Sequence, residues 1–401
     1  MKKTTMVILE NLGGIFVTLC VLFWLFYLDY TSEQGKLFAA TEQPQRLGFS
    51  KEKVDKCDVF EGEWVYDESY PLYDSKNCSF LDQGFRCNEN GRPDDLYSKW
   101  RWQPNSCALP RFNSGKMLEK LRNKRVVFAG DSIGRNQWES LLCMLSVSIK
   151  DKASVYEING NPITNHNGYL SFRFAQYNCT VEYFRSPFLV EQSRAPTGSP
   201  EHVKVTIKVD RMDWYEKNWR NADVVVLNMG HWWNYEKTLR SGSYFQELGE
   251  VKLEMGVEEA YRKATETVVK WMQGIQTNSL VVYRTYAPVH FRVCRDGDWK
   301  SGGHCHSETV PDTGVSLVPS GTWRHVRMVN ELLSSSSLGE RKYSVMNITA
   351  MAAKRKDGHP SVYYLSPNPA PFRRQDCSHW CLPGVPDAWN ELLYAQVMRV
   401  E

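Results

Sequence analysis

Val126-Val127-Phe128-Ala129-Gly130-Asp131-Ser132-Ile133-Gly134-Arg135-Asn136 is the stretch that decides the fold of this chain. Its first three residues are apolar and two of them are β-branched, which predicts a short buried strand. Ala-Gly-Asp then predicts a sharp turn. Downstream, Trp138, Leu141 and Leu142 fall on one side of a predicted helix. Ser132 is therefore expected where a strand ends and a helix begins.

The predicted position of Ser132 suits a nucleophile. Backbone N–H groups of a first helical turn have no intrahelical partners and favour negative charge. An oxyanion that forms beside a hydroxyl nucleophile would be stabilised there. The alternative is that Ser132 is only the helix N-cap, because serine is common in that role. Gly130-Asp131-Ser132 alone does not decide between the two.

A second informative stretch, residues 376–387, carries Asp376 and His379 three residues apart. A histidine can take the proton of a serine hydroxyl, and a carboxylate beside the imidazole fixes its tautomer. The alternative is a local turn at Asp376 with a structural histidine. The order of Ser132 first, then Asp376 and His379 near the C-terminus, favours the layout of an SGNH/GDSL-type hydrolase.

Three stretches resemble the plant trichome birefringence-like family: residues 57–65, 130–137 and 376–393. The resemblance covers roughly residues 55 to 400. It implies a Golgi polysaccharide O-acetyltransferase with an SGNH-like α/β/α core, the PC-esterase domain. It also implies that Ser132 carries the acyl group and that Asp376 and His379 complete its triad.

Composition allows a large globular protein. The chain has 401 residues, 42% of them hydrophobic, which is enough for two or three domains. A net charge of +3 implies no polyanionic partner, and the absence of long basic runs argues against nucleic acid. Fourteen Trp and twenty Tyr offer faces for stacking on sugars, although burial is their commoner use.

The N-terminus predicts a membrane anchor. Lys2 and Lys3 precede an uncharged, largely apolar run from Asn11 to Leu28. Residues 1–30 are therefore expected to be a cytoplasmic tail and signal-anchor helix, which leaves the rest of a single-pass type II protein in the Golgi lumen. Residues 31–54 read as a polar stem. A cleaved signal peptide is the alternative, although residues 37–40 make a weak cleavage site.

Ten cysteines follow the one in the apolar run, and an even number in a lumenal chain indicates disulfides. Spacing does not fix their connectivity. The family resemblance implies four pairs: Cys57–Cys107, Cys78–Cys143, Cys87–Cys381 and Cys305–Cys377. The last two would limit motion of the His379 loop. The zinc alternative rests on Cys294, His304, Cys305 and His306 and is weak, so no metal is expected.

Domain boundaries follow the composition. Residues 55–113 are rich in Cys, Trp and turn residues and read as a disulfide-stapled subdomain, and residues 114–401 read as the catalytic domain. In the latter, strands are predicted at 170–174, 180–184, 203–209, 223–227, 279–283 and 362–365, helices at 256–275 and 389–393, and a surface loop at 295–321. Alternating strands and helices predict a three-layer α/β/α sandwich.

The sequence offers further candidate positions. Oxyanion or substrate contacts are expected among Arg135, Asn136, Asn228, Gly230, His231 and Trp232. Arg135 has the alternative of pairing with an acidic neighbour. His231 has no carboxylate next to it in the sequence, so it is expected to be a groove or core residue. Glycosylation sequons begin at Asn77, Asn178 and Asn347.

These features together predict a two-step acyl transfer. Ser132 would take an acetyl group from a donor, and a hydroxyl of a cell-wall polysaccharide (xylan, pectin or another hemicellulose) would then attack the ester. The family makes acetyl-CoA the expected donor, although the chain has no Gly-rich phosphate loop, and no bound cofactor is expected. The alternatives are a polysaccharide acetylesterase with the same triad and a non-catalytic polysaccharide-binding or bridging protein. The sequence does not identify the polymer.

Overall fold

The computed structural model describes residues 58–164, 168–275, 279–291, 303–312, 320–334, 343–365 and 369–399. All of them belong to one compact unit, Phe49–Glu401. The predicted anchor and stem, Cys57 and Cys294 lie outside the described residues. Within the described ranges, no helix combines the length and apolarity needed to cross a bilayer.

A seven-stranded sheet carries the site, with β3 (Arg125–Gly130) at its centre. The strand order is β13-β12-β9-β3-β6-β5-β4. The pairs from β13 to β6 are parallel, whereas β6–β5 and β5–β4 are antiparallel. The other strands of this sheet are β4 (Val155–Glu157), β5 (Tyr169–Phe174), β6 (Cys179–Arg185), β9 (Val224–Asn228), β12 (Leu280–Arg284) and β13 (Tyr343–Met346).

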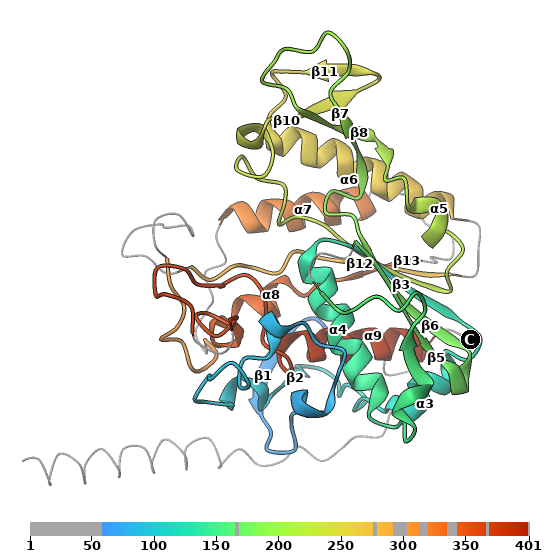
Figure 1. Cartoon of the computed structure of the whole chain (residues 1–401), viewed down its shortest axis with the longest axis vertical. Helices are drawn as coiled ribbons and strands as arrows, with labels where there is room; N and C mark the ends of the chain where they lie inside the picture. The colour runs from blue at the N-terminus through green and yellow to red at the C-terminus, as the bar shows by residue number, and fades with distance from the viewer. Residues whose placement is uncertain are drawn as a thin grey trace, which may run out of the picture. The chain divides into compact units, whose positions relative to one another are not determined.

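Helices cover both faces of this sheet, as Figure 1 shows. Val126 and Phe128 pack in a cluster with α3 (Ser114–Lys120), α4 (Ser132–Ser146) and α9 (Val385–Val397). Val127 and Ala129 face the other way, toward α6 (Val257–Gly274) and α7 (Ser320–Ser334). Successive residues of a strand point to opposite faces, so a fully apolar strand must be covered on both sides. The expected α/β/α sandwich is confirmed.

A smaller sheet of four strands lies against α6. Its order is β11-β10-β8-β7, with strands β7 (Val190–Arg194), β8 (Val205–Met212), β10 (Ser243–Glu247) and β11 (Glu250–Lys252). Thr267 of α6 donates from its hydroxyl to the carbonyl of Val209 in β8. The short helix α5 (Glu216–Trp219) follows β8 and leads back to the large sheet. The strand predicted at 203–209 therefore exists but belongs to this second sheet.

The N-terminal region has little regular structure. Strands β1 (Gly62–Tyr66) and β2 (Trp100–Pro104) form an antiparallel pair, and short 3₁₀ turns fill the segment between them. Trp64 and Trp102 are buried in the main core cluster. The described part of this region therefore packs on the sandwich through these two residues.

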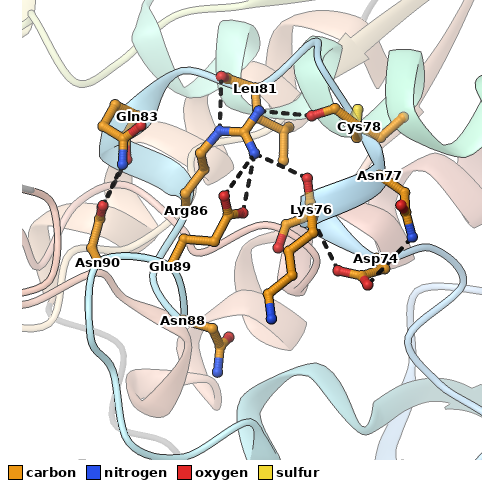
Figure 2. Close-up of polar contacts among 12 residues, drawn as sticks. Asp74, Lys76, Asn77, Cys78, Leu81, Gln83, Arg86, Asn88, Glu89 and Asn90 are labelled. Carbon is orange, nitrogen blue, oxygen red and sulfur yellow. Dashed lines mark hydrogen bonds and ion pairs between the residues drawn. A yellow bond between two sulfur atoms is a disulfide. The ribbon is translucent and has the colours of Figure 1, made fainter.

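Arg86 organises the turns of this N-terminal region, as Figure 2 shows. Its guanidinium donates to the carbonyls of Ser75, Leu81 and Cys78 and to the Glu89 carboxylate. Buried backbone carbonyls need such donors wherever no sheet or helix supplies them. One side chain thus holds a segment that has few ladder hydrogen bonds.

Two expectations about the C-terminal third need correction. The strand predicted at 362–365 is wrong: only an isolated bridge between Ser361 and Asp376 forms, and a turn follows it. The φ of Ser361 is +50°, so the chain bends before an extended run can start. The predicted loop at 295–321 runs into α7, which begins at Ser320. After α7 and β13 comes the short helix α8 (Thr349–Ala353).

Candidate active site

Ser132 is the first residue of α4, directly after the turn that ends β3. The N-cap of this helix is Asp131, whose carboxylate accepts the N–H of Ile133 at 3.0 Å. The N-cap alternative for Ser132 is therefore wrong, since the neighbouring aspartate fills that role. The hydroxyl of Ser132 is left available for another partner.

That partner is His379. The Ser132 hydroxyl lies 2.8 Å from Nε2 of His379, and the Nδ1 of the same ring lies 2.7 Å from Oδ2 of Asp376. Folding thus brings together residues that are 247 positions apart. A hydroxyl, an imidazole and a carboxylate in this order can pass a proton from oxygen to nitrogen while the carboxylate stabilises the resulting imidazolium.

The contact between Asp376 and His379 shifts the pKa of both groups. Burial disfavours the Asp376 carboxylate, but the His379 charge and N–H donors from His379 and Ser378 outweigh it and hold its pKa well below the ordinary value. Burial also opposes charge on His379, yet the facing Asp376 carboxylate raises the pKa of the imidazole. The side chains of His379 and Asp376 are 26% and 22% exposed, so solvent reaches the pair.

Asn228, at the end of β9, supports the turn that carries Ser132. Its Nδ2 donates to Oδ1 of Asp131 at 2.6 Å. Its Oδ1 lies against two glycines, and a Cβ would come within 2.1 Å of that oxygen at Gly130 and 2.0 Å at Gly134. Both positions therefore require glycine, because any side chain would displace the Asn228 amide.

The sequence comparisons agree with this geometry. Residues 109–396 match the PC-esterase family, described as a GDSL/SGNH-like acyl-esterase family found in Pmr5 and Cas1p, and residues 55–108 match the PMR5 N-terminal domain. The chain is 46% identical over 360 residues to protein trichome birefringence-like 9 of Arabidopsis thaliana, covering 88% of this chain and 86% of the relative. The chain belongs to the trichome birefringence-like family.

Two further relatives from Arabidopsis thaliana extend the same match. Protein trichome birefringence-like 6 is 41% identical over 364 residues, 89% of this chain and 74% of the relative. Protein trichome birefringence-like 31 is 36% identical over 386 residues, 92% and 89% of the two chains. The family assignment therefore covers both the PMR5 N-terminal domain and the PC-esterase domain.

Disulfides fasten the PC-esterase loop that carries the histidine. Cys377, which is bonded to Cys305, directly follows Asp376. Cys381, which is bonded to Cys87, lies two residues after His379. The second bond joins the loop to the PMR5 N-terminal domain, and Cys78–Cys143 joins that domain to α4. These are three of the four pairs that the family resemblance implied. The fourth involves Cys57, which lies outside the described residues.

Asn136 and Arg135 are buried and bonded to other parts of the protein. Asn136 is fully buried; its Nδ2 donates to the carbonyl of Trp380 and its Oδ1 accepts the N–H of the same residue. Arg135 is buried and pairs with Glu139 at 2.7 Å, which is the alternative given for it above. Both side chains are thus engaged inside the protein, and their role as oxyanion or substrate contacts stays a prediction that these contacts do not support. Asn136 instead fixes the backbone next to His379.

His359 supports the same backbone from the other side. Its Nδ1 lies 2.6 Å from the carbonyl of His379, and its Nε2 lies 2.6 Å from Nδ1 of His290. Burial lowers the pKa of both imidazoles. No feature of the local sequence distinguishes His359 as a neighbour of His379, because 20 residues separate them.

Sequence reasoning missed a second histidine–aspartate pair. Nδ1 of His231 lies 3.4 Å from Oδ2 of Asp131, and the His231 ring stacks on Tyr286 with centroids 4.3 Å apart. Burial opposes charge on Asp131, but His231, the Arg284 charge and Asn228 lower its pKa to about 2. The statement that His231 has no carboxylate neighbour is true in sequence and wrong in space. Asp131 and His231 follow adjacent parallel strands. That both residues come just after predicted buried strands was the sequence signal that could have indicated their proximity.

Gly230 and Trp232 flank this histidine. Gly230 has φ +144°, and a Cβ there would lie 2.7 Å from the Tyr286 ring, so the stacked arrangement depends on glycine. Trp232 has the Arg185 guanidinium 5.4 Å and the Lys237 ammonium 5.0 Å from its ring centroid. Trp232 thus lies next to two charged groups, and its role as a substrate contact stays a prediction.

Two other sets of predicted positions can be placed. Asn77 and Asn178 are exposed, whereas Asn347 is half-buried and the hydroxyl of Thr349 in its sequon is engaged inside the protein. Cys305 is in a disulfide, and Cys294 lies outside the described residues. No group of three potential metal ligands occurs among the residues that the structure describes.

Proposed function

We propose that this chain is a polysaccharide O-acetyltransferase that carries the acetyl group on Ser132. The observation that supports it most is the pair of short contacts from the Ser132 hydroxyl to His379 and from His379 to Asp376, 2.8 and 2.7 Å. Membership of a family described as GDSL/SGNH-like acyl-esterases supports the reaction class. The acceptor we propose is a plant cell-wall polysaccharide.

The first step forms the acyl-enzyme. The Ser132 oxygen attacks the carbonyl of an acetyl thioester, for which we propose acetyl-CoA, and His379 takes the hydroxyl proton. The tetrahedral oxyanion forms at the start of α4, where first-turn N–H groups favour negative charge. The C–S bond then breaks, and the thiol leaves with the proton from His379.

The second step regenerates the serine. A sugar hydroxyl gives its proton to His379 and attacks the acetyl-serine carbonyl. The bond between the acetyl carbon and the Ser132 oxygen breaks, and His379 returns the proton to that oxygen. The low pKa of Asp376 keeps its carboxylate ionised, so it stabilises the imidazolium in both steps.

We further propose that the protein is a Golgi membrane protein with its catalytic domain in the lumen. Lys2 and Lys3 before the apolar run support this orientation. The disulfides support an oxidising compartment, because such bonds seldom persist in the cytosol.

One observation favours an acetylesterase as the second candidate. The side chains of His379 and Asp376 are about a quarter exposed, so water has access to the same base that a sugar hydroxyl would use. A transferase must bind its acceptor well enough to exclude that water. The two activities share every step except the identity of the final nucleophile.

Mass spectrometry separates these possibilities. The full-length protein is incubated with isotope-labelled acetyl-CoA, quenched in acid and digested, and we expect the label on Ser132 and none in the Ser132→Ala variant. Oligosaccharides of xylan, galacturonan or mannan are then added. Labelled glycan supports the transferase, and labelled free acetate alone supports the esterase. A Ser132→Ala protein that still acetylates glycan would refute Ser132 as the acetyl carrier, whereas a parent protein that yields neither labelled serine nor labelled product would favour a binding role.

A further inference from the structure

An open groove of about 710 Å³ lies on the surface at one edge of the large sheet. Ligand-binding pockets commonly have volumes of this size. Its lining combines aromatic, cationic and amide side chains: Arg185, Pro187, Gln192, Asp213, Trp214, Tyr215, Lys217, Asn218 and Trp232. Nothing in the proposed chemistry at Ser132 requires these residues.

The groove begins beside the candidate active site. Arg185, the last residue of β6, lies opposite Gly130 in the parallel register with β3. The N–H of Ser186 then donates to the carbonyl of Gly130 at 2.8 Å. On the other side of β3, Trp232 follows His231, which contacts Asp131. Two lining residues are thus tied to the turn that carries Ser132.

Trp214 is exposed to solvent on a turn that the Asp213 side chain holds by hydrogen bonds. The Asp213 carboxylate accepts the N–H of Tyr215 at 3.0 Å and the hydroxyl of Ser186 at 2.7 Å. The side chain of Trp214 between these anchors is nevertheless 65% exposed. An exposed indole adds little to the packing of the fold. A large aromatic side chain held at the surface in this way is typical of a binding face.

The other two aromatic residues of the groove are backed by buried rings. Tyr215 lies 5.7 Å from the ring of Phe184, and Trp232 lies 5.9 Å from that of Phe188. Packing from behind fixes these rings before any ligand arrives. A preorganised aromatic surface loses little side-chain entropy on binding, which favours ligands with flat apolar faces such as sugar rings.

The charge of the groove is positive. Arg185 and Lys217 are exposed, and within the described ranges neither forms an ion pair with a carboxylate. Asp213, the one acidic residue of the lining, is occupied by Tyr215 and Ser186. Two available cations beside aromatic rings suit a sugar that carries a carboxylate.

We propose that this groove binds the acceptor glycan and that it prefers chains containing uronic acid residues. The inference rests on the proposed function, because the groove would hold a polymer whose hydroxyl reaches Ser132. Sugar rings stack on Trp214 and Tyr215, while Arg185 and Lys217 pair with uronate carboxylates. The shared chemistry is the uronate, which occurs either in the backbone of a galacturonan or as a side group on a xylan.

Calorimetric titration tests the groove without acetyl chemistry. Full-length protein with Ser132→Ala is titrated with three probes: hexagalacturonate, a glucuronate-substituted xylo-oligosaccharide and unsubstituted xylohexaose. We expect at least one acidic probe to bind about tenfold more tightly than xylohexaose, with the stronger one identifying the source of the uronate. Added Trp214→Ala or Lys217→Gln should weaken that binding by about tenfold.

Matched controls lie at the opposite end of the sheet. Tyr156 is 45% exposed on β4 and pairs with Arg173, which lies across from Thr180 at the start of β6. Lys150 is exposed beyond the far end of α4. Tyr156→Ala and Lys150→Gln should bind the acidic probe as the parent does.

The outcomes separate this inference from the proposed function. Equal binding of acidic and neutral probes, or undiminished binding by Trp214→Ala, would overturn the proposal that the groove binds the acidic glycan, even if Ser132 is acetylated. Selective binding that depends on Trp214 would support glycan binding in the groove even if Ser132 never carries acetyl. In that case only the proposed transferase function would be refuted.

Discussion

Two histidine–aspartate pairs lie next to the start of α4, and they differ in what holds them. His231 and Asp131 follow adjacent strands of the sheet, with Asp131 fully buried. His379 and Asp376 lie on a loop before α9 that two disulfides fasten. The histidine and aspartate of the loop pair are 2.7 Å apart, whereas those of the sheet pair are 3.4 Å apart. His379 of the loop pair also lies 2.8 Å from the Ser132 hydroxyl.

The difference shows that chemical type alone does not assign a base. The Asp131 carboxylate already accepts from Ile133 and Asn228, so it serves the helix start and the neighbouring strand. The Asp376 carboxylate accepts three N–H groups, all from its own loop, and aligns the imidazole by doing so. We infer that the first pair shapes the site and the second does the proton transfer.

Replacing each histidine is the strongest test of that distinction. His379→Ala should lower the rate of acetyl transfer by at least about a thousandfold, because the serine loses its base. His231→Ala should lower it by about tenfold or less, through a looser Asp131. Both rates are measured as labelled acetyl transferred to glycan. Similar losses in the two variants would abolish the distinction.

The sheet pair can be disturbed without touching either of its members. In Gly134→Ala, the new Cβ would lie 2.0 Å from Oδ1 of Asn228 and push that amide away from Asp131. We expect unfolding to become easier by about 1–3 kcal/mol and transfer to fall more than tenfold.

Gly274→Ala is the control for this substitution, since it also lies in a helix and has nothing within 4 Å of the added Cβ. It should leave transfer unchanged and unfolding unchanged or harder. If both alanines behave alike in denaturant titrations, contact with Asn228 is not what Gly134 provides.

The loop pair can be loosened through Asn136. Asn136→Ala removes both bonds to the backbone of Trp380, so His379 should sample more positions. We expect kcat to fall about tenfold with little change in KM, because the change affects alignment of the base and not acceptor binding. Steady-state kinetics with a saturating donor measure both constants.

Gln137→Ala serves as the comparison, since Gln137 is equally buried but bonds to Asn390 of α9. It should cost stability with a smaller loss of kcat. A kcat for Asn136→Ala that equals that of Gln137→Ala would show a general packing effect in place of a positioning one.

The smallest expected effect concerns carboxyls whose pKa is raised, unlike that of Asp131 and Asp376. Burial raises the pKa of Glu139, Asp387 and Glu391 to about 7 each. At these three carboxyls, the folded state therefore binds more protons than the unfolded chain between about pH 4 and 7. Their stabilising contribution is complete below the unfolded pKa and is lost as pH rises through about 7.

The melting temperature should accordingly rise by several degrees between pH 8 and pH 5.5. Asp387→Asn removes one titrating group and should flatten this dependence, which scanning calorimetry at a series of pH values measures. A melting temperature that falls on acidification over this range would show that ionised carboxylates dominate instead.

Local signals predicted the centre of the molecule. The strand–turn–helix around Ser132 follows from residues that are adjacent in sequence, and the amphipathic helix near 256–275 is confirmed at Val257–Gly274. The strand expected at 362–365 failed because Ser361 adopts a left-handed conformation that no propensity for Val or Tyr can override.

Contacts between distant segments were not accessible in the same way. Asn136 bonds to Trp380 across 244 residues, and His231 meets Asp131 only because β9 pairs with β3. Without the strand order, both side chains were open to a substrate-binding interpretation. The disulfide pairs came from the family resemblance, since ten cysteines do not define their own partners.

The bond between Cys87 and Cys381 also bears on how the chain is made. Its two halves are 294 residues apart, so during synthesis the first thiol leaves the ribosome long before the second. Cys107 and Cys143 emerge in that interval, and Cys78 has emerged before it, so each of these thiols is chemically competent to capture Cys87. Correct disulfide formation therefore requires that Cys87 stay reduced until Cys381 has been synthesised, or that a non-native disulfide of Cys87 be exchanged afterwards.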